Sequence, residues 1–166
     1  MTAIRLAQDG ELFPIRASGG DWLSAWRPAG EAPDGTPHGA TGLCVTPEGQ
    51  VVLINQRGVQ WEWPGGRPEP GGTWEETCSV VGDARLLGFC RSECLSGPEE
   101  GLVLVRSVWR GEVELLPWQA RFEVRRRRLF SPEELRSNFW INEGWEPIVY
   151  RALAEAGLLV AGERDL

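Results

Sequence analysis

Apolar runs separated by Gly- and Pro-rich turns predict a chain built mainly from strands. Residues 39–46 combine β-branched and small apolar side chains, and residues 51–56 form a second run that is almost entirely apolar. The turn at residues 47–50, Pro-Glu-Gly-Gln, joins them into a predicted hairpin. Because the second run has no polar alternation, we expect it to be buried on both faces.

Further strands are predicted in the second half of the chain. Residues 84–90 form one and residues 101–110 the clearest, with a turn at residues 96–100 between them. Alternation continues through residues 112–117. Residues 122–130 contain four consecutive arginines, which a strand would place two on each side.

Two helices are predicted near the C-terminus. Ser131-Pro-Glu-Glu is a capping sequence with Pro at the first helical position, and the helix should continue to about Asn138. Residues 145–157 carry an apolar stripe that includes Ile148 and Leu153, and Gly157 is a natural stop. We expect an α/β fold with strands in the majority.

The first part of the chain is of mixed character. Trp22 and Trp26 are four residues apart, a spacing that suits a helical turn or a loop anchor. Residues 27–37 are rich in Pro and Gly and predict a connector. We therefore assign residues 1–37 to an N-terminal extension and connector, and residues 38–166 to the main domain.

The most distinctive stretch is residues 61–77, where three tryptophans, two Gly-Gly pairs and three prolines fall within a shaped loop. It ends in Thr73-Trp-Glu-Glu, a capping box that predicts a helix from Trp74. This stretch resembles the opening of the signature of the Nudix hydrolases, G-x5-E-x7-R-E-U-x-E-E-x-G-U with U aliphatic. The matching residues are Pro64, Gly65, Gly66, Glu69, Gly71 and Thr73.

The same stretch departs from the signature in two places. Gly72 occupies the position of the first signature Glu, and the R-E-U-x-E-E segment is absent. In the family, this segment places three glutamates at i, i+3 and i+4 on one helix face, where they converge on metal ions. Glu75 and Glu76 are adjacent and would diverge by about 100° on a helix. No carboxylate follows Glu75 at either offset.

The resemblance implies a Nudix-type α-β-α sandwich around a mixed β-sheet and a metal-dependent pyrophosphohydrolase reaction. For catalysis it points to Glu69 and Glu76, and for Mg²⁺ or Mn²⁺, if the protein is active, to Glu75 and Glu76. The alternative is that these carboxylates are a solvated loop residue and a capping pair. Glu99, Glu100 and Glu143 are further candidates for a general base, or else solvated turn residues.

Nucleotide binding is expected at the loop and its flanks. The residues assigned to it are Arg57, Trp63, Gly65, Gly66 and Arg67. The arginines suit phosphate contact through their planar fork, and the alternative is loop salt bridges. Trp61 and Trp63 suit a stacking wall for a nucleobase, or filling of the core beside the hairpin.

Composition narrows the range of partners. The net charge of -7 argues against general nucleic-acid binding and against anionic membranes, although Arg125 to Arg128 form either a solvated strand edge or an anion-binding patch. Cys90 and Cys94 have no second pair, which favours buried thiols over a zinc site. The first residues lack a secretory h-region and no apolar run approaches membrane length, so the expected location is cytoplasmic.

Three functions remain in contention. The first is a divergent Nudix hydrolase-like protein that recognises a small-molecule nucleotide diphosphate and has lost most or all of its hydrolysis. The second is an active hydrolase of nucleoside diphosphate derivatives that uses carboxylates outside the signature. The third is a non-catalytic interaction module.

Overall fold

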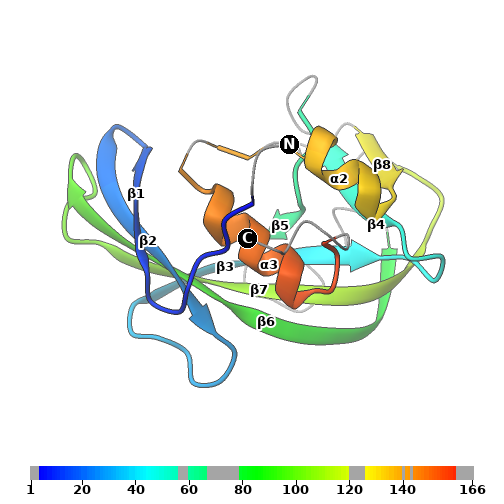
Figure 1. Ribbon diagram of the computed structural model, residues 1–166, viewed down its shortest axis with the longest axis horizontal. Helices are drawn as coiled ribbons and strands as arrows, with labels where there is room; N and C mark the ends of the chain where they lie inside the picture. Colours follow the sequence, from blue (N-terminus) through cyan, green and yellow to red (C-terminus); the bar gives the residue numbers. More distant parts are fainter. Residues whose placement is uncertain are drawn as a thin grey trace. The chain divides into compact units, whose positions relative to one another are not determined.

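The computed structural model describes residues 4–55, 60–66, 79–119, 126–139, 141–142 and 144–159. Eight strands follow in chain order (Figure 1): β1 (Leu12–Ala17), β2 (Gly20–Pro28), β3 (Thr36–Val45), β4 (Val51–Asn55), β5 (Gly65–Gly66), β6 (Ser79–Ser96), β7 (Val103–Leu115) and β8 (Arg126–Phe130). Two helices, α2 (Pro132–Asn138) and α3 (Glu146–Glu155), follow them. The predicted α/β class is confirmed.

The strands share one hydrogen-bonded path, β1-β2-β6-β7-β3-β4-β8, with β5 paired to β3. The pairs β1–β2, β2–β6, β3–β4, β3–β5 and β4–β8 are antiparallel, and an isolated bridge between Trp61 and Phe139 is parallel. Contacts divide the chain into two compact units. Unit 1 comprises Met1–His38, Leu87–Ser107 and Ile141–Leu166, and unit 2 comprises Gly39–Leu86 and Val108–Trp140.

In unit 1, the segment that carries Trp22 and Trp26 is a strand, so the expected helical turn or loop anchor is wrong. Ser18 and Gly19, with φ of 51° and 72°, form a tight turn that folds β2 back onto β1. On its other edge β2 pairs with β6, where Trp22 faces Cys94 and Trp26 faces Cys90. Two paired neighbours satisfy the backbone of β2 on both edges, and this outweighs the helical spacing of the tryptophans.

Helix α3 covers the core of unit 1 with Ile148, Val149, Ala152 and Leu153. Its end is a Schellman motif, because the Gly157 N–H donates to the Ala154 carbonyl (3.0 Å) and the Leu158 N–H to the Leu153 carbonyl (2.9 Å). Gly157 has a φ of 73°, which confirms it as the residue that stops the helix.

One arginine attaches the N-terminal segment to α3. Arg151 donates to the Ala7 carbonyl and to Asp9, each at 2.8 Å, and its Cζ lies 5.8 Å from the centroid of the fully buried Trp26 ring. Residues 12–17 and 20–28 lie in paired strands of unit 1, while the domain boundary near residue 38 stays a prediction.

Unit 2 contains the predicted hairpin. Cys44 pairs with Val52, and the Thr46 N–H donates to the Gln50 carbonyl at 2.9 Å across the turn. Every residue of β4 is buried, as its unbroken apolar run predicts. The short helix α2 is also confirmed, with the Glu134 carboxylate accepting from the Ser131 hydroxyl at 2.9 Å.

Candidate ligand-binding site

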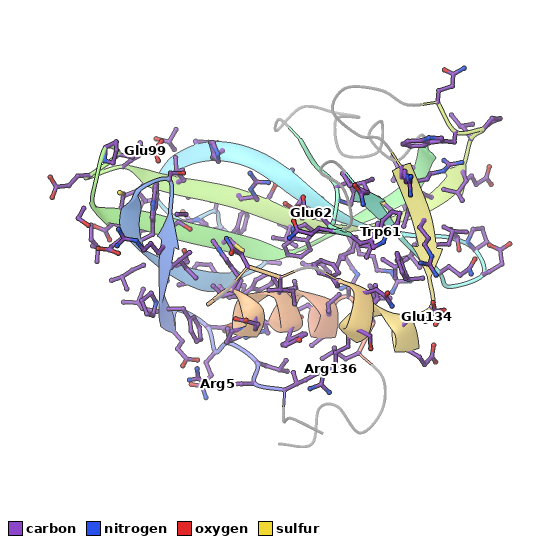
Figure 2. The ribbon with its side chains drawn as sticks, turned by 90° about the horizontal axis from the view of Figure 1, so that it is seen from above. Arg5, Trp61, Glu62, Glu99, Glu134 and Arg136 are labelled. Atoms are coloured by element: carbon purple, nitrogen blue, oxygen red, sulfur yellow. The ribbon has the colours of Figure 1, made fainter. Side chains whose placement is uncertain are left out.

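Residues 60–66, the described part of the predicted loop, are held against β3 and β4 by backbone hydrogen bonds. Glu62 and Ile54 exchange two bonds of 2.9 Å, and the Gly42 N–H donates to the Pro64 carbonyl at 3.1 Å. Gly65 and Gly66 then form β5 opposite Thr41 and Ala40. The segment that leads into the signature is therefore fixed in register on the sheet of unit 2 (Figure 2).

Two edge-to-face aromatic pairs anchor the same segment. The Trp61 ring lies 5.6 Å from Phe130 at an interplanar angle of 68°, and the Trp63 ring lies 5.6 Å from Phe139 at 82°. Both phenylalanines are buried, whereas both tryptophans are half-buried. Core packing is thus part of the role of each tryptophan, and each indole keeps some exposed surface. We call Trp61, Trp63, Phe130 and Phe139 the aromatic frame.

Of the residues assigned to nucleotide binding, Trp63, Gly65 and Gly66 belong to this frame or to the strand beside it. Arg57, Arg67, Glu69, Glu75 and Glu76 lie outside the described residues, as does the helix expected from Trp74. Their roles stay predictions.

The arginine run gives β8 two different sides. Arg126 and Arg128 are exposed, whereas Arg127 is half-buried, as strand alternation predicts. Arg127 donates to the Leu116 carbonyl, and its Cζ lies 5.5 Å from the Trp118 ring. Arg128 lies over Phe130, with its Cζ 4.8 Å from the ring centroid. Arg125 is outside the described residues.

The remaining candidates that the structure describes are not grouped as metal ligands. Across the parts of the chain that the structure describes, no three His, Cys, Asp or Glu side chains are grouped to hold a metal ion. Cys90 and Cys94 are buried free thiols, and burial raises the pKa of Cys90 to about 12. Glu99 and Glu100 lie exposed in the turn after β6, where Figure 2 shows Glu99, and Glu143 is not among the described residues.

The two phenylalanines of the frame were missed in the sequence. Phe130 was predicted to lie in a strand but not to support the loop, and Phe139 directly follows the helix predicted from Ser131 to about Asn138. The alternation of β8 does place Phe130 and Arg128 on one face, and this signal was available in the sequence. No sequence signal links Trp63 to Phe139, because that contact depends on a long-range pairing.

Comparison with known proteins identifies the architecture. The structure is similar to that of a Nudix hydrolase from Nitrosomonas europaea, with a TM-score of 0.51 and 21% sequence identity over 74% of this chain and 89% of that one. The chain has a Nudix-type fold. The solution structure of the E. coli ORF135 protein is also similar, with a TM-score of 0.41 and 17% identity over 76% and 97% of the two chains.

No protein-family model and no curated protein sequence matches the chain. At this level of identity the structural likeness extends to the fold, and the chemistry has to be argued from the residues. Neither described helix is long and apolar enough to cross a membrane.

Proposed function

We propose that this protein is a divergent Nudix hydrolase-like protein that binds a small molecule containing a nucleoside diphosphate and hydrolyses it slowly or not at all. One observation carries the proposal. On a Nudix-type fold, the Trp61–Gly66 segment that opens the signature is held in register by β3, β4 and the aromatic frame. A preorganised segment lowers the entropic cost of ligand binding, and this supports a binding role for residues 61–66.

The loss of hydrolysis is proposed on the chemistry of the metal site. Pyrophosphate hydrolysis needs divalent ions that neutralise the phosphate oxygens and activate water. Mg²⁺ needs convergent oxygen ligands, and Gly72 together with the missing R-E-U-x-E-E segment removes most of them. Glu69, Glu75 and Glu76 are the carboxylates of the loop that we assign to any residual reaction.

The test combines a thermal shift with a product assay. The purified chain is incubated with Mg²⁺ or Mn²⁺ and a panel of nucleoside diphosphates, nucleoside diphosphate sugars and ADP-ribose. A ligand that binds the folded state at 100 times its Kd stabilises it by about 2.7 kcal/mol. For a chain of this size that corresponds to a rise in Tm of roughly 5–10 °C. We expect such a shift with at least one nucleotide and no release of phosphate-bearing products.

The variants E69Q and E76Q, with E48Q as the matched control, separate the alternatives. Glu48 lies in the exposed turn between β3 and β4 of the same unit and carries the same charge. Turnover in the wild type that is abolished by E69Q or E76Q but kept in E48Q establishes an active hydrolase. Absence of both turnover and thermal shift across the panel leaves the interaction module.

A further inference from the structure

One face of β8 carries two exposed arginines, Arg126 and Arg128, and ends at the buried Phe130 of the aromatic frame. Arg126, Arg128 and Phe130 alternate along the strand and so share one face. Phe130 contacts both the Arg128 guanidinium, 4.8 Å from its centroid, and the Trp61 ring, 5.6 Å from it. Because both distances are measured to the Phe130 centroid, the Arg128 Cζ and the Trp61 centroid lie at most about 10 Å apart.

Among the described residues, Arg126 and Arg128 differ from several other arginines in having no acidic partner. Carboxylates pair with Arg5, Arg16, Arg91, Arg110 and Arg151. Within the described ranges, no carboxylate lies within ion-pair distance of Arg126 or Arg128. In a chain with a net charge of -7, two neighbouring guanidiniums that have no carboxylate partner among the described residues form a local positive surface, against the average charge of the protein.

We infer that Arg126 and Arg128 bind the phosphates of a nucleoside diphosphate whose base contacts the half-buried Trp61. The inference rests on the proposed function and adds the phosphate-contacting side chains to it. A guanidinium that lies over an aromatic ring loses little freedom on binding and still presents N–H donors to an anion at its edge. A nucleotide spans such a separation between its base and its terminal phosphate.

The competing explanation is that the charges only protect an edge strand, because β8 ends the path of the sheet. Protection of an edge strand requires only that charged side chains lie along it. This explanation does not require the Arg128 guanidinium to lie over Phe130, the ring that also contacts Trp61. The two explanations predict different effects on ligand affinity.

The experiment is isothermal titration calorimetry with ADP, GDP, CDP, UDP and inorganic pyrophosphate on the full chain. The variants are R126Q, R128Q, the double variant and R128K, with R27Q as the matched control. Arg27 is an exposed strand arginine of unit 1, so R27Q removes the same charge elsewhere. Circular dichroism checks that each variant folds. We expect the β8 variants to fold because the Arg126 and Arg128 side chains are exposed.

We expect the double variant to weaken the tightest nucleoside diphosphate by about 10-fold, since charge-assisted contacts at an exposed site are of moderate strength. R27Q should change the affinity by less than about 2-fold. R128K should bind more tightly than R128Q but more weakly than the wild type, because an ammonium lacks the guanidinium fork. Pyrophosphate should bind more weakly than the nucleotide, and W61F should reduce nucleotide binding alone.

Other results overturn the inference. If the double variant binds the nucleotide as tightly as the wild type, the arginines are not the phosphate contacts, while the proposed function stands. The same conclusion follows if only pyrophosphate binding is weakened. If the wild type binds none of the five probes, the inference fails. The proposed function fails with it only if the nucleoside diphosphate sugars and ADP-ribose also give no thermal shift.

Discussion

The aromatic frame can be tested by a double-mutant cycle between Trp63 and Phe139. The single variants are W63L and F139L, and the double variant combines them. Leucine keeps an apolar side chain at each site but removes the ring, so the edge-to-face contact is lost without leaving a polar group or a large cavity. The cycle then reports the energy of the contact that fixes Trp63.

The structure sets the size of the effect. Phe139 is 8% exposed, so F139L should lower the free energy of unfolding by about 1–2 kcal/mol. The rings lie 5.6 Å apart at 82°, close to the preferred perpendicular arrangement. Such pairs contribute about 0.5–1.5 kcal/mol beyond the burial of their area. We therefore expect the double variant to lose about 1 kcal/mol less unfolding free energy than the sum of the losses in the two single variants.

The assay is urea unfolding followed by circular dichroism, with Cm and m fitted for each of the four proteins. An unchanged m-value shows that the variants alter stability and not the extent of unfolding. Each 1 kcal/mol also shifts the Tm by about 2–4 °C in a chain of this size, which gives an independent measurement.

The control cycle combines W63L with L115A. Leu115 packs against the Cys44, Val52 and Val113 cluster, whose described members do not include Trp63. Its two losses should add to within about 0.5 kcal/mol. A coupling energy between Trp63 and Phe139 that is no larger than in the control would refute the frame and remove the main support for a preorganised loop.

Two more predictions concern β6. A Cβ at Gly88 would lie 2.3 Å from Trp26 Cζ2, so G88A should lower the free energy of unfolding in urea by about 2 kcal/mol or more. On the same strand, a Cβ at Gly82 meets nothing closer than 3.6 Å, so G82A should change it by less than about 0.5 kcal/mol, and equal losses in the two variants would contradict this packing. The Cys90 thiol has a pKa of about 12 in the fold against 9.0 as its ordinary value, so the unfolded state loses its proton first as the pH rises. The free energy of unfolding of the wild type should therefore fall, relative to that of C90V, by about 1.4 kcal/mol per pH unit from pH 9 towards pH 12. If the difference in unfolding free energy between the two proteins stays constant over this range, the thiol is not buried.

Local signals in the sequence were sufficient for much of the fold. Turn residues at 47–50 and 96–100, the capping sequence at Ser131 and the stop at Gly157 each depend on neighbours within a few residues. Those predictions are confirmed, because the energies that decide them are local. The failure at Trp22 and Trp26 has the opposite cause, since β2 is determined by its pairing with both β1 and β6.

For the site, the sequence by itself determined the resemblance to the Nudix signature, the glycine at position 72 and the absence of the R-E-U-x-E-E segment. These are properties of residue order, so they need no tertiary structure. The tertiary structure alone decided which rings support the loop and that Arg128 lies over Phe130, the ring that Trp61 contacts. Those contacts join residues 61–63 to residues 128–139, and such partners are chosen by strand register and packing, which no local pattern specifies.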